Sequence, residues 1–314
     1  MKSKLQNAAH IVIHDCLRIK KREKVVIVFD DACRQVGEAL WHVAKEIVDP
    51  LIIEITPRSI HGEEPPPLIA EIIKRSDVFI LPTSRSLTHT RARIEATKHG
   101  ARGATMPGIT VDIMGRSLNT DYRWIARMTE RVAAVLSKGK KALIETGSGA
   151  RLELTLSGRK GYIDTGLLHK PGAFSNLPGG EAYIAPEETK STGTVVFDGS
   201  FAPFGSLKQP VTLHLEKGGI TKVSGSRKLK SIFSSYGKHE RVLCELGIGT
   251  NPSAKITGNV LEDEKALGSI HLAFGNNLGF GGHNKARIHL DGVIKKPTLW
   301  IDRSLIINKG KFLL

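Results

Sequence analysis

Four polar residues in the C-terminal part of the sequence are of types that bind metal ions: Glu245, His271, His289 and Asp291. Two of them stand in the segment IHLDG at 288–292, which is predicted to form a strand. Side chains two residues apart in a strand project to the same face, so His289 and Asp291 would lie side by side. An imidazole beside a carboxylate favours a divalent transition metal. The alternative is that Asp291 opens an Asp-Gly turn and His289 is a half-buried strand residue.

The other candidates stand next to apolar, strand-like segments. His271 alternates with Ile270 and Leu272 in SIHLAFG, where a single histidine is more often a hydrogen-bonded core residue than a ligand. Glu245 follows VLC and precedes a glycine-rich stretch, and Glu181 begins an apolar step directly after a tight turn. A carboxylate in apolar surroundings is costly unless it is paired or bound to a metal. These positions therefore favour a metal centre over isolated charges.

The remaining motifs favour structural roles. The consecutive acids at 262–264 point in different directions and are interpreted as structural, at a helix start or in a loop. The glycine-rich segments 247–249 and 279–282 are interpreted as turns, and neither matches a phosphate-binding pattern. No GxSxG context supports serine catalysis. His169 and His283 lie near glycine turns, where contact with substrate or metal is an alternative to the favoured surface role.

Two kinds of periodicity divide the sequence. Short apolar runs predict buried strands at 25–29, 51–55 and 77–82, and residues 36–47 carry apolar side chains at helical spacing between the first two. This alternation predicts βαβ units with a parallel sheet. We therefore expect residues 1–139 to form an α/β domain of the flavodoxin-like kind.

The pattern of apolar and polar residues changes in the second half of the chain. ALIET and RLELTLSG alternate apolar and polar residues on either side of GSG at 147–149, which predicts a hairpin. Strand-like segments follow at 194–197, 211–215 and 220–224. The predicted fold class is thus α/β, with the N-terminal parallel-sheet domain followed by a β-rich α+β metal-binding domain over 140–314.

The composition excludes several classes. With 314 residues, 40% of them hydrophobic, the chain is expected to fold into packed domains. The net charge of +15 is scattered over short basic runs and only 5% of residues are aromatic, so a nucleic-acid partner is not favoured. No apolar run approaches the roughly 20 residues of a membrane span, and a cytoplasmic location is expected. Three widely spaced cysteines without a CxxC disfavour a thiolate zinc site.

Four segments together resemble a known enzyme family. NLPGGEAYIAPEE, ELGIGTNP, LEDEKALGSIHLAFGNN and IHLDGVIKKPTLWID are similar, in order and wording, to signature segments of the aminopeptidase T / aminopeptidase S metallopeptidases, most densely over 176–302. The resemblance implies a cytoplasmic, two-domain homodimer that cleaves small peptides at a site of two zinc, cobalt or manganese ions. The metal ligands that it implies are Glu181, Glu245, His271, His289 and Asp291. Either glutamate could also take the proton of the attacking water.

One departure leaves a second chemistry open. The family's tyrosine position holds Leu278, and Tyr183 is the candidate to substitute for it. The sequence also resembles the related dihydroxypyridine ring-cleaving dioxygenases, in which two histidines and an aspartate hold one Fe(II); His271, His289 and Asp291 would supply such a triad. We expect a metal-dependent, aminopeptidase-like hydrolase. The dioxygenase is the alternative, and a non-catalytic or nucleic-acid-associated relative is the second alternative.

Overall fold

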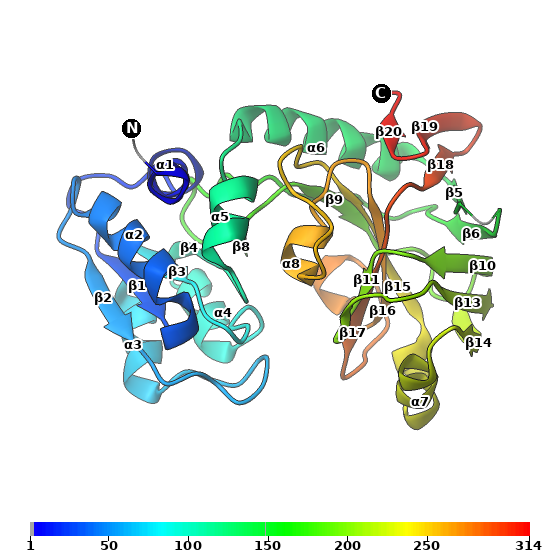
Figure 1. Ribbon diagram of the computed structural model, residues 1–314, viewed down its shortest axis with the longest axis horizontal. Coiled ribbons are helices and arrows are strands. Elements are labelled where there is room, and N and C mark those ends of the chain that lie inside the picture. Colours follow the sequence, from blue (N-terminus) through cyan, green and yellow to red (C-terminus); the bar gives the residue numbers. More distant parts are fainter. Residues whose placement is uncertain (1–2, 148) are drawn as a thin grey trace. The chain divides into compact units, whose positions relative to one another are not determined.

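The computed structural model describes residues 3–147 and 149–314. Contacts divide it into two units (Figure 1). The first unit comprises the chain up to Ala126 together with Asp164–Gly179, and the second comprises Arg127–Ile163 and Gly180–Leu314.

The first unit is built on a parallel sheet of five strands in the order β2-β1-β3-β4-β8. These strands are β1 (Val25–Phe29), β2 (Leu51–Glu54), β3 (Val78–Leu81), β4 (Arg102–Thr105) and β8 (Phe174–Asn176). Its helices are α1 (Lys4–His10), the π-helix η1 (Ile11–Cys16), the 3-10 helix η2 (Asp31–Cys33), α2 (Arg34–Ala44), α3 (Pro67–Arg75), α4 (Arg91–Lys98) and α5 (Val111–Ser117). The predicted parallel-sheet α/β fold is confirmed.

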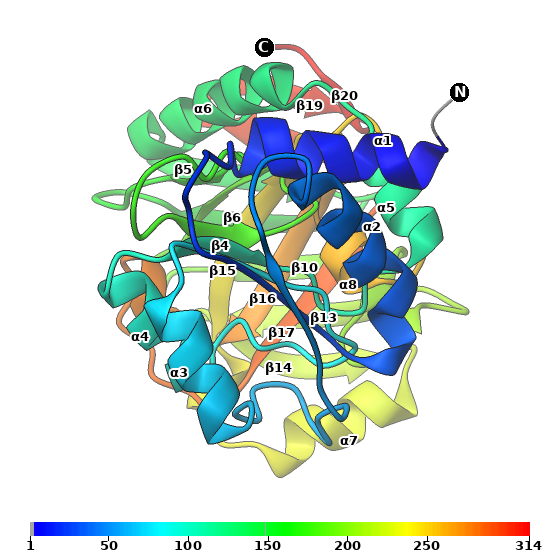
Figure 2. The same ribbon diagram turned by 90° about the vertical axis from the view of Figure 1, so that its left-hand side faces the viewer.

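Helices cover both faces of this sheet (Figures 1 and 2). Along β1, Val25 and Ile27 join a cluster with residues of α1, α2 and α5, whereas Val26 and Val28 join a second cluster with residues of α3 and α4. Both faces of β1 are therefore buried. This explains why its sequence is an unbroken apolar run.

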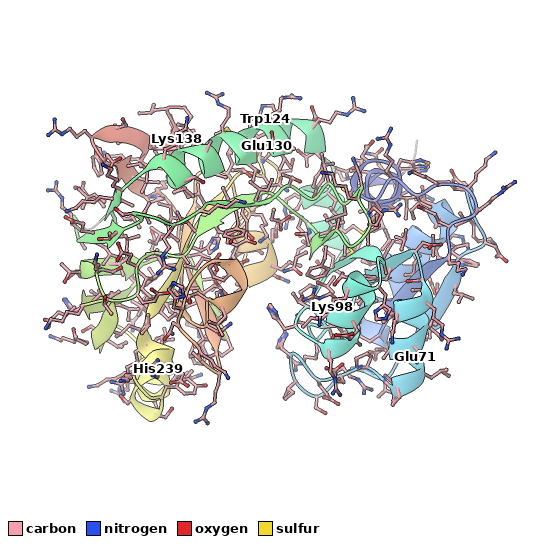
Figure 3. All side chains as sticks on the ribbon, turned by 180° about the vertical axis from the view of Figure 1, so that it is seen from behind. Glu71, Lys98, Trp124, Glu130, Lys138 and His239 are labelled. Carbon is pink, nitrogen blue, oxygen red and sulfur yellow. The ribbon has the colours of Figure 1, made fainter. Side chains whose placement is uncertain are left out.

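The division between the units differs from the predicted boundary after residue 139. It falls inside α6 (Tyr122–Lys138), whose two ends are marked by Trp124 and Lys138 in Figure 3. The segment Asp164–Gly179, which the sequence assigned to the second domain, contributes β8 to the parallel sheet. Because β8 is only three residues long and its sequence does not alternate, the sequence gives no signal for this strand. The extents of independently folding domains stay a prediction.

The second unit contains two sheets, and neighbouring strands with a defined register run antiparallel in both. The eight-stranded sheet has the order β14-β13-β10-β6-β5-β18-β19-β20, and the seven-stranded sheet has the order β12-β11-β17-β16-β15-β9-β7. The strands of the first are β5 (Lys141–Glu145), β6 (Arg151–Thr155), β10 (Thr192–Phe197), β13 (Val211–Glu216), β14 (Gly219–Ser224), β18 (Thr298–Ile301), β19 (Ser304–Asn308) and β20 (Lys311–Phe312). Those of the second are β7 (Tyr162–Asp164), β9 (Glu181–Ile184), β11 (Ser200–Phe201), β12 (Gly205–Ser206), β15 (Leu243–Gly249), β16 (Ile270–Gly275) and β17 (His289–Ile294).

Short helices complete this unit: α7 (Arg227–Ser235), η3 (His239–Arg241), α8 (Val260–Asp263) and η4 (Leu278–Phe280). The predicted hairpin strands are present as the antiparallel pair β5 and β6. Ser148 at its predicted tip lies outside the described residues. Apolar side chains of both sheets form one core cluster, which includes Leu152, Leu246 and Leu272.

No helix in the described part of the chain is both long and apolar enough to cross a membrane.

Candidate metal centre

Four neighbouring strands bring the five predicted ligands to one face of the seven-stranded sheet. In the registers of β17, β16, β15 and β9, Asp291 lies opposite Ala273, His271 opposite Gly247, and Gly249 opposite Glu181. Because side chains alternate along each strand, the odd-numbered positions share this face. The even-numbered positions, such as Leu246 and Leu272, pack into the core.

The five side chains form a continuous chain of contacts. Nε2 of His271 lies 3.6 Å from Oε2 of Glu181 and 3.3 Å from Oε1 of Glu245. Nε2 of His289 lies 3.2 Å from Oε2 of Glu245 and 3.4 Å from Oδ1 of Asp291. Glu245 therefore stands in the middle, with one oxygen on each histidine.

Glycine at position 247 makes room for one of these rings. A Cβ atom at Gly247 would stand 2.0 Å from the imidazole of His271. The sequence predicted a turn at 247–249, and this prediction was wrong, because these residues belong to β15. Glycine is needed here because the ring lies against the backbone of the neighbouring strand.

Hydrogen bonding fixes which nitrogen of His289 faces the carboxylates. Its Nδ1 lies 2.9 Å from the carbonyl oxygen of Asn276, which only accepts, so Nδ1 carries the proton. Nε2 is then the atom that Glu245 and Asp291 face. Histidines that bind metal ions typically donate a hydrogen bond from the other ring nitrogen to such a carbonyl oxygen, which sets the tautomer.

Two polar atoms at the centre are buried without a hydrogen-bond partner among the described residues: Oε2 of Glu181 and Nδ1 of His271. Burial of such atoms is costly. A cation beside Oε2 of Glu181 would remove part of this cost.

The centre strongly favours positive charge. Burial lowers the pKa of His271, but Glu245, Glu181 and Glu264 outweigh it and raise that pKa to about 9. Burial likewise opposes the charge of His289, whose pKa Asp291 nevertheless raises well above its usual value. Burial raises the pKa of Glu245, yet hydrogen bonds from both histidines bring it down to about 2.

A buried lysine that the sequence did not predict lies in the same centre. Nζ of Lys265 donates to Oε1 of Glu181 at 2.6 Å and approaches Oε2 of Glu264 at 3.3 Å. Only 1% of Lys265 is exposed. In the sequence it stands in the charged run EDEK, which resembles a solvated surface.

The acidic run 262–264 has two roles. Glu262 accepts from the backbone N–H of Lys255, and Asp263 accepts from those of Thr257 and Gly258, which confirms the structural interpretation for these two. Glu264 departs from it. Burial and the nearby Asp291 raise its pKa to about 8, so this carboxyl group belongs to the centre.

Aromatic rings stand beside the histidine of β17. Tyr183, two residues after Glu181 on the same strand face, stacks on Tyr162 with a centroid distance of 5.7 Å. Phe280 meets Tyr183 edge-on at 5.4 Å and His289 edge-on at 6.2 Å.

The loop that carries Phe280 joins β16 to β17 and is fixed by Glu188. This carboxylate accepts from the backbone N–H of His283 at 2.6 Å and from Nδ2 of Asn277 at 3.1 Å, and it pairs with Arg159 at 2.5 Å. Burial raises the pKa of Glu188, but these hydrogen bonds lower it overall.

The structure also describes three other positions that were singled out from the sequence. The side chain of His283 is exposed, and Leu278 in η4 is 52% exposed. His169 belongs to the first unit, where its Nε2 lies 2.7 Å from the carbonyl oxygen of Asp15.

The donor set fits a divalent transition metal. Imidazole nitrogen and carboxylate oxygen bind such ions at about 2.0–2.2 Å, which places neighbouring ligand atoms roughly 3 Å apart. The contacts of 3.2–3.6 Å between imidazole and carboxylate atoms are close to this spacing. These contacts run in a line from Glu181 through His271, Glu245 and His289 to Asp291, so the structure shows the donor atoms side by side and not as a closed coordination shell.

Comparison with known proteins decides the family. The family model described as 2,5-dihydroxypyridine 5,6-dioxygenase matches residues 2–314. The chain belongs to this family. It is 23% identical over 215 residues to the 2,5-dihydroxypyridine 5,6-dioxygenase of Pseudomonas putida. That match covers 63% of this chain and 61% of the relative, so it spans less than two thirds of the relative's length.

Two solved structures share the fold. The 2,5-dihydroxypyridine dioxygenase from Pseudomonas putida KT2440 has a TM-score of 0.81 at 17% identity, covering 99% of this chain and 96% of that one. Wild-type AmpT from Thermus thermophilus has a TM-score of 0.73 at 17% identity, covering 99% of both chains. At such identities these likenesses show a common fold.

The family assignment corrects the class of enzyme that was predicted from the sequence. The chain was predicted to be an aminopeptidase, a metalloprotease, and this prediction was wrong, because the dioxygenase family matches it nearly from end to end. The prediction that the chain is an enzyme agrees with its family.

Proposed function

We propose that this protein is an Fe(II)-dependent dioxygenase that opens a hydroxylated pyridine-type ring. The observation that carries the proposal is the placement of His271, His289 and Asp291 on the adjacent strands β16 and β17. Two histidines and one carboxylate with open positions are the ligand set of non-haem iron oxygenases. Membership of the 2,5-dihydroxypyridine 5,6-dioxygenase family supports the same chemistry.

His271, His289 and Asp291 would hold the iron through Nε2 of each ring and a carboxylate oxygen. A ferrous ion so held supplies the one-electron chemistry that lets O2 react with an electron-rich ring. The carbonyl oxygen of Asn276 lies 2.9 Å from Nδ1 of His289. This hydrogen bond keeps the protonated Nδ1 turned away from the carboxylates. Glu245 lies between the two rings and holds both in orientation.

Lys265 gives Glu181 a role other than metal binding. Its ammonium group takes one oxygen of Glu181 at 2.6 Å and thereby balances one of the buried negative charges. Glu181 and Glu245, proposed from the sequence as ligands and catalytic groups, are on this account positioning residues. Their further use as ligands stays a proposal.

Tyr183 and Phe280 supply the surface for an aromatic substrate. Phe280 meets both the ring of Tyr183 and that of His289. Planar rings pack favourably by stacking or edge contacts with aromatic side chains. These two side chains would hold the substrate ring near the metal ligands and exclude water from it.

Oxygen consumption tests the function. We expect the protein, loaded anaerobically with Fe(II) and mixed with 2,5-dihydroxypyridine, to consume O2 as the ring absorbance disappears. His289→Ala should abolish this uptake. His283→Ala is the matched control, because His283 is an exposed histidine in the preceding loop, and it should retain uptake. Undiminished uptake in His289→Ala would contradict the assignment.

A further inference from the structure

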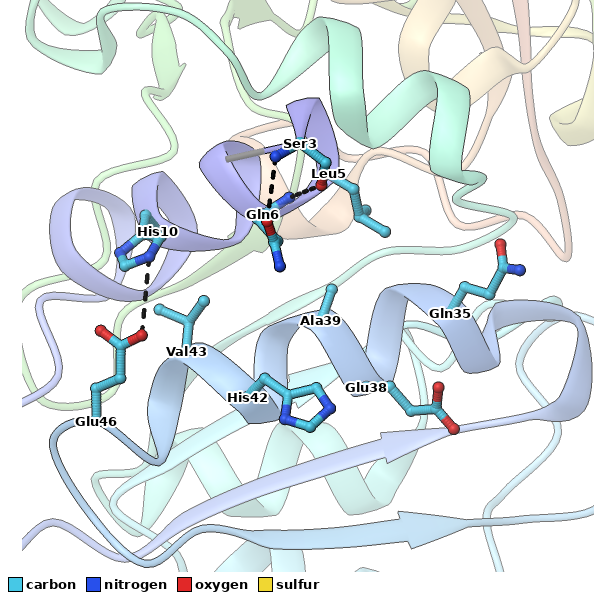
Figure 4. A pocket seen from close by; sticks show the side chains of 10 residues that line it. All are labelled: Ser3, Leu5, Gln6, His10, Gln35, Glu38, Ala39, His42, Val43 and Glu46. Atoms are coloured by element: carbon cyan, nitrogen blue, oxygen red, sulfur yellow. Dashed lines mark hydrogen bonds and ion pairs between the residues drawn. The ribbon is translucent and has the colours of Figure 1, made fainter. Parts of the chain in front are cut away.

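A second group of metal-binding side chains lies in the first unit. His10 is the last residue of α1, His14 lies in η1, and Glu46 follows α2. One ligand atom from each lies within 4.8 Å of the other two. Nε2 of His10 and Oε1 of Glu46 are 4.0 Å apart (Figure 4).

The helix type changes between the two histidines. The α-helix becomes a π-helix at Ile11, and the backbone N–H of Leu17 donates to the carbonyl oxygen of Val12 at 2.9 Å, five residues back. His10 and His14 are four residues apart, a spacing at which side chains lie on the same face of a helix. The rings of His10 and His14 are accordingly almost parallel, at 9° and 5.4 Å between centroids. Such segments are rare and often mark functional sites.

The backbone beneath this group is firmly packed, whereas the ligands face solvent. Val12 and Ile13, between the two histidines, are fully buried in the core. A pocket of about 530 Å³ opens between α1 and α2, and His10 and Glu46 line it together with His42 (Figure 4). An ion can therefore reach the group without any movement of the backbone.

We propose that His10, His14 and Glu46 bind a divalent cation of the zinc class. Two imidazoles and a carboxylate are ligands that Zn²⁺ takes at about 2.0–2.2 Å, with water completing a tetrahedron. Ligand atoms around such an ion lie roughly 3.3 Å apart, so rotations of the three side chains close the site. The ion ties the leading helix to the end of α2. It shares no residue with the candidate centre of the second unit.

Zinc titration of the full-length chain tests the site. By calorimetry, His14→Gln should bind one zinc ion per chain fewer than the wild type. His42→Gln, which changes an exposed histidine of the same pocket outside the group, should bind as many as the wild type. Glu46→Gln should weaken this site about tenfold, because a neutral amide replaces the carboxylate. Any zinc that binds at the candidate centre is the same in all variants, so it does not change the difference in stoichiometry between them.

A second measurement distinguishes loss of the zinc site from misfolding of the variant. Saturating zinc should raise the melting temperature of the wild type more than that of His14→Gln, since only the wild type gains the binding energy of this site. Both proteins should melt alike in a chelator. Equal zinc stoichiometry in the wild type and His14→Gln would overturn the proposal. An equal loss in His42→Gln would overturn it as well, because binding would then be unspecific.

Discussion

Gly247 controls whether the ring of His271 can lie in the candidate centre. Gly247→Ala places a methyl group 2.0 Å from that ring and must displace it. We expect the affinity for Fe(II) to fall about 10- to 100-fold, as it does when the support of a ligand is disturbed. Metal content after equilibrium dialysis measures this. Gly147→Ala, where an added Cβ meets nothing within 4 Å, should leave the affinity unchanged.

Lys265 also acts at the scale of a single residue. Removing it in Lys265→Met leaves the buried carboxylate of Glu181 without its cation. We expect the free energy of unfolding to fall by about 3 kcal/mol, since a buried charge loses its partner. Denaturant unfolding of the metal-free protein measures this. The double variant Glu181→Gln Lys265→Met should recover most of the loss, and strictly additive losses would contradict the pairing.

At the scale of elements, the loop between β16 and β17 presents Phe280 to the ring of His289. If Phe280 contacts the substrate ring, Phe280→Leu should raise KM about three- to tenfold, because an aromatic contact is worth roughly 0.5–1.5 kcal/mol. Iron content should not change. Steady-state kinetics beside metal analysis separate the two effects. Phe204→Leu, at a partly exposed phenylalanine near Lys228, is the control, and an equal rise in KM there would contradict the role of Phe280.

Glu23 and Arg102 connect the entry of β1 to β4 and predict how the first unit responds to acid. Burial raises the pKa of Glu23, but the guanidinium of Arg102 and the backbone N–H of Lys20 lower it overall. A carboxyl group with a lowered folded-state pKa stabilises the fold above its unfolded pKa, near 4.3, and loses that effect as the pH falls through the folded value. We expect Glu23→Gln to be less stable than the wild type at pH 7, with the difference shrinking below about pH 4. A difference that is independent of pH would contradict this.

At the scale of the whole molecule, local patterns predicted the parts of the fold that depend on periodicity. The apolar run at β1 and the alternation in β5 and β6 each reflect a burial pattern within one segment. Period two also placed His289 and Asp291 together, as their contact of 3.4 Å shows. Glu245, His271 and Glu181 were candidates because of their residue types beside apolar segments, and the resemblance to a known family implied that they act as ligands.

What the sequence could not predict depends on contacts between distant segments. Lys265 meets Glu181 across 84 positions only because α8 leads into the strands of the same sheet, and no local pattern reports this. The strand β8 is too short to show a period. The class of reaction was mistaken because the same ligand types serve hydrolysis and oxygenation, and ligand identity alone does not separate them.

Several predictions concern the molecule as a whole and remain predictions: a homodimer, a small-molecule substrate and a cytoplasmic location. The family assignment bears on none of them directly. The zinc-class site proposed at His10, His14 and Glu46 is likewise independent of the oxygenase chemistry.

Isotope labelling tests the central claim most directly. The Fe(II)-loaded protein should convert 2,5-dihydroxypyridine under ¹⁸O2 to a ring-opened product that contains both labelled oxygen atoms. Mass spectrometry of the product measures this, with unlabelled O2 in labelled water as the reciprocal experiment. A product that takes its oxygen only from water would contradict the account, because it would show hydrolysis at this centre.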